Sequence, residues 1–230
     1  MSGYGQYCPV AKAAEVLGEK WSIIILRELA ISDQTFNSLR RGMPLISPTL
    51  LSKRLKTLMA HEVVERMETA GGVQYRLTQA GLELKDLIMQ LGVWGQRWVR
   101  SDYSKPDLDA SLLMWDMHRT INTEPFPASQ RVIQFEFLGV PAKDRFYWLV
   151  VANREVEVCM KNPGFDVDLH IQCALKEFTA FWMGETTLTA LERAQKIRVE
   201  GDSQLRKSMG KWLCGSAFSG VERGHLVAQA

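Results

Sequence analysis

The 230-residue chain carries 28 Lys and Arg against 26 Asp and Glu, a net charge of +2, and is long enough for two modest domains. No uninterrupted apolar stretch approaches the ~20 residues that span a bilayer, and the N-terminus lacks the apolar core of a signal peptide. These absences predict a cytoplasmic protein without a membrane partner. The basic excess lies in residues 1–105, with 14 basic against 10 acidic residues, whereas residues 106–230 carry 14 against 16.

The run Phe36–Leu58 predicts two short helices joined by a turn, and it contains five Lys or Arg but no Asp or Glu. The first amphipathic stretch, Phe36–Arg41, is followed by a glycine and a proline that break it. Ser47 then stands where a helix N-cap is expected, and Pro48 occupies the first turn, which tolerates a missing N–H. The second helix has an apolar face at helical spacing, formed by Leu51, Leu55 and Leu58.

The opposite face of this second helix is small and polar at first and basic afterwards, which is typical of a recognition helix in DNA. Two strand candidates, Val63–Met67 and Gln74–Leu77, follow around a glycine turn, so the pattern predicts a winged helix. An ordinary solvated helix with a basic surface is the alternative. The residues expected to contact a double-stranded DNA operator are Arg40, Arg41, Ser47, Thr49, Ser52, Lys53, Arg54, Lys56 and Arg76.

A long helix is expected after Thr78, a suitable N-cap residue. It would carry an apolar stripe at spacings of three and four residues, formed by Leu84, Leu87, Leu91, Trp94 and Trp98. The stripe could pack onto its own domain, but Gly92 and Gly95 would let two helices approach closely, which favours a homodimer. Two recognition helices would then enter successive major grooves about 34 Å apart.

The first hundred residues resemble the HxlR family of bacterial winged-helix regulators. The resemblance rests on these segments: Cys8–Val10, Leu17–Trp21, Ile23–Leu29, Phe36–Arg40, Ile46–Leu55, Tyr75–Thr78 with Gly81, and Trp94–Gly95 with Trp98. It implies a dimeric repressor or activator whose recognition helix is Ser47–Leu58. It also implies a role for Cys8, because several family members sense oxidants or electrophiles with a cysteine at this position.

The setting of Cys8 suits a reactive thiol, because Pro9 marks a helix start and a helix N-terminus lowers a thiol pKa. A buried structural cysteine near Trp21 is the alternative. The cysteines, Cys8, Cys159, Cys173 and Cys214, show no paired spacing. We therefore expect reduced thiols, with no metal site and no cofactor.

The polar segment Ser101–Asp107 reads as a boundary, which gives a DNA-binding and dimerisation domain at 1–105 and a second domain at 106–230. After a helix at 108–120, three strands are expected: Val132–Phe137, Tyr147–Val151 and Glu155–Met160. They are predicted to form an antiparallel meander, with the second strand buried on both faces.

Two helical patterns, Leu169–Trp182 and Leu188–Ala194, precede a strand at Ile197–Val199 and a last helix capped by Asp202. At Gly184–Glu185, Ala190–Ala194 and Ile197–Asp202, the region 131–213 resembles sterol carrier protein-like domains, in which a sheet and helices enclose an apolar tunnel. This resemblance implies a small hydrophobic ligand, although large aromatic side chains could equally fill a core. The candidate lining residues are Phe135, Phe137, Trp148, Phe178, Phe181, Trp182 and Met183.

No nucleophile motif or phosphate-binding loop supports an enzyme. The predicted fold is α+β, a winged helix-turn-helix followed by a sterol carrier-like domain with an antiparallel sheet. The predicted function is a dimeric, DNA-binding transcriptional regulator that responds to a small hydrophobic ligand. The alternatives are a redox-sensing regulator that switches through Cys8 and a lipid-binding or carrier protein.

Overall fold

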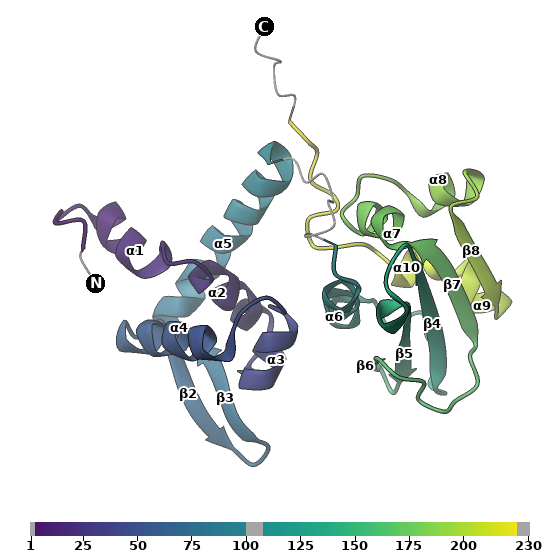
Figure 1. Ribbon diagram of the computed structural model, residues 1–230, viewed down its shortest axis with the longest axis horizontal. Coiled ribbons are helices and arrows are strands. Elements are labelled where there is room, and N and C mark those ends of the chain that lie inside the picture. Colours follow the sequence, from purple (N-terminus) through teal and green to yellow (C-terminus); the bar gives the residue numbers. More distant parts are fainter. Residues whose placement is uncertain (1–2, 100–107, 225–230) are drawn as a thin grey trace, which may run out of the picture. The chain divides into compact units, whose positions relative to one another are not determined.

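The computed structural model describes residues 3–99 and 108–224 and divides into two compact units, Met1–Gly95 and Gln96–Ala230 (Figure 1). Each unit folds around its own hydrophobic core. The segment 101–107 and the domain boundary expected after residue 105 lie outside the described residues. Within the part that is described, no helix combines the length and the apolar character needed to cross a bilayer.

The first unit is mainly helical and has a small antiparallel sheet, ordered β1-β3-β2. Its last helix, α5, continues into the second unit. The elements in chain order are α1 (Pro9–Leu17), α2 (Ser22–Ile31), β1 (Gln34–Thr35), α3 (Phe36–Arg41), α4 (Pro48–Ala60), β2 (Val64–Thr69), β3 (Gly72–Leu77) and α5 (Gln79–Trp98). The predicted helix-turn-helix and the hairpin that follows it are therefore confirmed.

Two helices of this unit, α4 and α5, begin at side-chain caps that the sequence encodes. The N–H of Leu50 donates to the Ser47 hydroxyl at 3.2 Å, as expected for the N-cap of α4. The N–H of Gly81 donates to the Thr78 hydroxyl at 3.2 Å, at the start of α5. These bonds fix the entry points of the two helices that carry the candidate DNA and dimer surfaces.

The second unit is built on a five-stranded sheet ordered β6-β5-β4-β7-β8. Its elements in chain order are α6 (Ala110–Thr120), β4 (Arg131–Leu138), the short 3-10 helix η2 (Ala142–Asp144), β5 (Phe146–Ala152), β6 (Glu155–Cys159), β7 (Leu169–Ala174), α7 (Leu175–Trp182), α8 (Leu188–Arg193), β8 (Ile197–Gly201), α9 (Ser203–Lys207) and α10 (Met209–Trp212). The predicted meander of β4, β5 and β6 is confirmed, because both pairings are antiparallel.

Three expectations for this unit are wrong. Leu169–Ala174 is a strand, not the first part of a helix, and it pairs in parallel with β4 and antiparallel with β8. The sheet is therefore mixed instead of antiparallel. The final helix is also two short helices, α9 and α10, although Asp202 does cap the first of them by accepting from the N–H groups of Gln204 and Leu205.

The two faces of the larger sheet belong to different apolar clusters. Ile133, Phe135 and Phe137 of β4 lie in the main core with residues of α6 and α7. Val132, on the opposite face, lies in a smaller cluster with Val150, its register partner on β5, and with Trp148, which pairs with Gln134. The helices therefore cover one face of the sheet (Figure 1).

Candidate nucleic-acid interface

The outer face of α4 is exposed, cationic and free of carboxylates. Thr49, Lys53 and Lys56 are exposed and Ser52 is half-buried, while the apolar face of the same helix is buried. A shallow groove runs along this outer face and is lined by Pro48, Thr49, Ser52, Lys53, Lys56, Thr57, Ala60 and His61. Small side chains near the N-terminus and lysines further along match the division between base contacts and phosphate contacts.

Further cations flank α4. Arg40 and Arg41 lie in the last turn of α3 and are exposed, where positive charge also complements the helix dipole. Arg76, on the wing strand β3, pairs with Glu65 directly across the hairpin, with 2.6 Å between Nε and Oε1. Because both side chains are nearly half exposed, this ion pair is weak and a phosphate can compete for Arg76.

Arg54 does not belong to this surface, which corrects the sequence expectation. Its side chain is buried, its Nε donates to the carbonyl of Lys20 at 3.0 Å, and its Nη2 forms an ion pair with Glu19. Arg54 thus ties α4 to the turn between α1 and α2. Its position could have been foreseen, because it lies three residues after Leu51 and four before Leu58, on the apolar side of the helix.

A buried carboxylate that the sequence analysis missed lies behind the turn between α3 and α4. Glu28 of α2 is fully buried, and its Oε1 accepts from Nη2 of Arg27 at 2.6 Å. A Cβ on Gly42, the C-cap of α3, would lie only 2.0 Å from Oε2 of Glu28. A side chain at this position would have to displace the buried Glu28 carboxylate, so the cost of replacing Gly42 is steric, since its own dihedral angles are ordinary right-handed helical ones.

Cys8 is the N-cap residue of α1 and is half-buried, so it is not the buried structural cysteine considered as an alternative. The backbone N–H groups of Ala11 and Val10, at the start of α1, lower the pKa of its thiol. Burial has the opposite effect elsewhere: it raises the pKa of Cys159, and it raises that of Cys173 to about 12. Cys8 is therefore set apart from these two thiols by its helix terminus.

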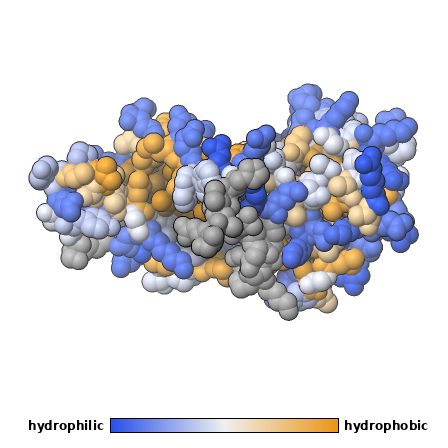
Figure 2. Space-filling view, turned by 90° about the horizontal axis from the view of Figure 1, so that it is seen from above, coloured by the Kyte–Doolittle hydropathy of each residue, from blue (hydrophilic) through white to orange (hydrophobic). Residues whose placement is uncertain are grey.

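The apolar stripe of α5 is only partly a surface. Leu87, Leu91 and Trp94 are 65, 47 and 56% exposed, whereas Leu84 packs against the core of the first unit. Trp98 lines a pocket of the second unit. Trp98 is itself 40% exposed, so of the five stripe residues Leu84 is the one withdrawn from the surface. Figure 2 shows apolar surface (orange) among hydrophilic surface (blue).

The aromatic residues proposed to line a tunnel pack against one another. Phe178 makes edge-to-face contacts with Phe135, Phe137 and Phe181 at centroid distances of 5.5–5.7 Å, and Trp182 is buried with its Nε1 donating to Asp116 at 2.7 Å. Met183 is partly buried against the same cluster. Trp148 is on the opposite face of the sheet and cannot line a cavity with the others, so its assignment is corrected.

A helix-turn-helix followed directly by an antiparallel hairpin defines a winged helix-turn-helix protein. The profile of the HxlR-like helix-turn-helix family matches residues 16–103. The chain belongs to this family.

Two relatives agree with this assignment by sequence. YvaP, an uncharacterized HTH-type transcriptional regulator of Bacillus subtilis (strain 168), is 31% identical over 98 residues, which are 41% of this chain and 91% of YvaP. The HTH-type transcriptional regulator YodB of the same organism is 32% identical over 95 residues, 40% of this chain and 85% of YodB. The solved structure of reduced YodB from B. subtilis aligns at 28% identity and a TM-score of 0.36, covering 44% of this chain and 98% of that one. These relatives are transcriptional regulators and not enzymes, and the family match ends before the second unit begins its sheet.

Proposed function

We propose that the first unit binds double-stranded DNA through α4 and that a homodimer of the chain regulates transcription from a pseudo-palindromic operator. The observation that carries this proposal is the outer face of α4, which is exposed, contains Lys53 and Lys56, and has no acidic residue. Thr49 and Ser52, one turn closer to the N-terminus, are the candidates for base contacts.

The salt dependence of DNA binding tests this proposal. After an operator is selected from random duplexes, its affinity is measured by fluorescence anisotropy at several salt concentrations. Lys53→Ala with Lys56→Ala removes four lysines per dimer, so the log–log salt slope should become shallower by about 3.6, at about 0.9 per phosphate contact. Lys207→Ala, which removes an exposed lysine of the second unit, is the control and should leave the slope unchanged. An unchanged slope in the double variant would refute the assignment of α4.

The dimer is proposed to form through α5. Leu87, Leu91 and Trp94 lie at helical spacing and are exposed, which is costly for a lone protein in water and favourable if a second copy covers them. At the N-terminus of the same unit, Tyr4 and Tyr7 are also exposed and add to the apolar surface that pairing could bury.

The second unit is proposed to be the sensor of a small molecule. Supporting this, it has its own core, and it contains the last turn of the helix that begins in the DNA-binding unit. Its mixed sheet with helices on one face is compatible with a sterol carrier-like fold. Native mass spectrometry of the purified, reduced protein tests for a resident ligand: a dimer with extra mass that denaturation releases supports a sensor, and an empty dimer argues against a tightly held apolar guest.

A second candidate function is redox sensing through Cys8. It is favoured by the lowered pKa of this thiol at the N-cap of α1, because the thiolate is the species that reacts with oxidants and electrophiles. YodB, a relative of this chain, has been solved in a quinone-bound form. Cys8→Ser should abolish the effect of diamide on operator binding, and Cys214→Ser, which removes an exposed thiol, should not. An oxidant response that survives Cys8→Ser would exclude this function.

A further inference from the structure

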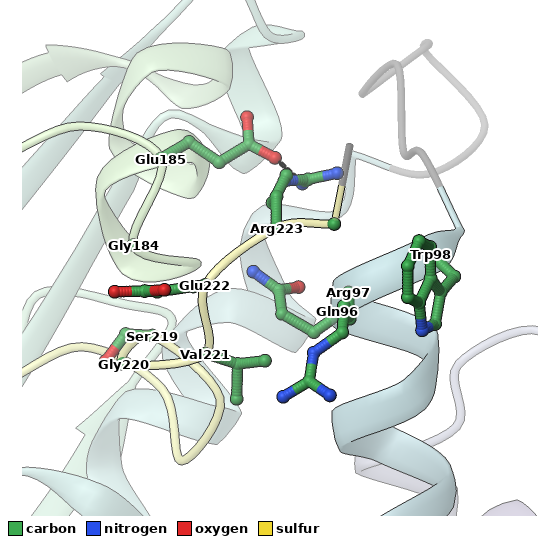
Figure 3. Close-up of a pocket in the computed structure, with 11 residues that line it drawn as sticks. Gln96, Arg97, Trp98, Gly184, Glu185, Ser219, Gly220, Val221, Glu222 and Arg223 are labelled. Carbon is green, nitrogen blue, oxygen red and sulfur yellow. Dashed lines mark hydrogen bonds and ion pairs between the residues drawn. The ribbon is translucent and has the colours of Figure 1, made fainter. Parts of the chain in front are cut away.

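The second unit contains a pocket of about 640 Å³ that lies outside its aromatic core. Its wall is made by the last turn of α5, the turn after α7 and the C-terminal segment 219–224 (Figure 3). The volume lies within the range of about 300–1,000 Å³ that small-molecule sites occupy. The lining residues are Gln96, Arg97, Trp98, Gly184, Glu185, Ser219, Gly220, Val221, Glu222, Arg223 and Gly224.

Backbone contacts hold this wall in place. The N–H of Ser216 donates to the carbonyl of Trp182 at 2.7 Å, and the N–H of Gly224 donates to the carbonyl of Arg97 at 3.0 Å. Gly184 has a φ of +80°, and a Cβ there would lie 2.0 Å from the carbonyl oxygen of Ser219. Because these contacts fasten the C-terminal segment at both ends, the pocket is preformed.

The polar side chains of the wall differ in whether they already have a hydrogen-bond or ion-pair partner. Arg223 forms an ion pair with Glu185, and the side-chain amide of Gln96 donates to the carbonyl of Met183 at 2.8 Å. The guanidinium of Arg97 is exposed and has no ion-pair partner among the residues that the structure describes. Arg97 is therefore the cation that a ligand can engage, and a guanidinium fork matches a carboxylate in two parallel hydrogen bonds.

The remaining wall residues restrict the ligand further. Val221 lies across from the Arg97 side chain and offers an apolar surface to a ligand held there, whereas the ring of Trp98 lies on the other side of the last turn of α5, against Gly224 (Figure 3). Glu222 lies on the side of Gly184, away from Arg97, where its charge would repel a second anionic group (Figure 3). These walls favour a ligand with one negative charge and an aromatic body.

We propose that this pocket binds a small aromatic monocarboxylate, with Arg97 holding the carboxylate and Val221 contacting the ring. The inference rests on the proposed regulatory function, because it names the site and ligand class of the sensor. The proposed site lies outside the aromatic core, where the ring side chains pack against one another, and its ligand is more polar than a lipid.

Isothermal titration of the full-length protein with 2-naphthoate tests the pocket, and 2-naphthamide serves as the uncharged comparison. We expect one naphthoate per chain and at least tenfold weaker binding of the amide. Arg97→Gln should weaken naphthoate binding by about tenfold or more, because it removes a charge-assisted pair. The control is Arg198→Gln, which removes an exposed arginine on β8. Absence of naphthoate binding at millimolar concentration, or equal affinities for Arg97→Gln and the wild type, overturns the proposal.

Operator binding of the same preparations, measured without naphthoate, separates this inference from the proposed function. Operator binding together with an absence of naphthoate binding overturns the pocket and leaves the DNA-binding unit as proposed. Naphthoate binding that depends on Arg97, in a protein that binds no operator, supports the pocket and overturns the regulatory function on which its role as a sensor rests.

Discussion

Arg54→Met distinguishes a buried clamp from a DNA contact, because methionine keeps much of the aliphatic stem and removes the guanidinium. Two bonds are lost, one to the Lys20 carbonyl and one to Glu19, each worth about 1.5–3 kcal/mol as charge-assisted hydrogen bonds. The change also removes Nη1, a buried donor without a hydrogen-bond partner, whose desolvation costs about 1–3 kcal/mol. Because water can solvate Glu19 once the guanidinium is gone, we expect the free energy of unfolding to fall by about 2 kcal/mol in total.

Urea unfolding followed by circular dichroism measures this loss, which corresponds to a midpoint shift of about 1 M. Lys53→Met is the matched control at the adjacent, exposed position, and it should change the free energy of unfolding by less than about 0.5 kcal/mol. Operator binding should show the opposite ranking of the two variants: the log–log salt slope becomes shallower for Lys53→Met and stays unchanged for Arg54→Met. If Arg54→Met were as stable as the control and lowered the salt slope, Arg54 would be a phosphate contact and the clamp would be refuted.

Three further predictions concern the oligomer, the thiols and the turn before α4. Leu91→Asp should give monomers in size-exclusion chromatography with light scattering, whereas Lys85→Asp, on another face of α5, should not; a dimeric Leu91→Asp would contradict the α5 interface. Iodoacetamide should label Cys8 at a lower pH than Cys159, and Cys173 last, because a thiol with a lowered pKa is thiolate at lower pH; mass spectrometry showing Cys159 labelled first would reverse this. Gly42→Ala should lower the free energy of unfolding by about 1–3 kcal/mol through its clash with Glu28, while Gly71→Ala, whose Cβ would lie 3.8 Å from Thr69, should be close to neutral in the same urea titration.

The helix-turn-helix could be read from the sequence because its signals are local. Ser47 and Pro48 mark the start of α4, and the leucine spacing marks its buried face, within a single short segment. The environment of Arg54 is different, because its partners Glu19 and Lys20 lie more than thirty residues earlier in the chain, as the separation of 34 between Arg54 and Lys20 shows. Charge type alone placed Arg54 with the lysines, whereas helical position would have separated it from them.

The second unit was harder to predict because β7 runs directly into α7. Leu169, Ile171 and Cys173 alternate with polar residues as a strand requires, but apolar residues continue at helical spacing through Trp182. Because no turn residue stands at position 174 or 175, the helical spacing of α7 continues backwards in the sequence over the strand. The parallel pairing of β7 with β4 depends on tertiary contacts, which no local sequence pattern encodes.

The central position of β4 constrains how the second unit can fold during synthesis. This strand pairs with β5 soon after it is made, but its other edge waits for β7, which begins at Leu169. A nascent or truncated chain that ends before Leu169 would present the unpaired edge of β4, with the apolar side chains of Ile133, Phe135 and Phe137 still uncovered by α7. Such a fragment should aggregate, so the unit can fold productively only after the ribosome has released the chain well beyond α7.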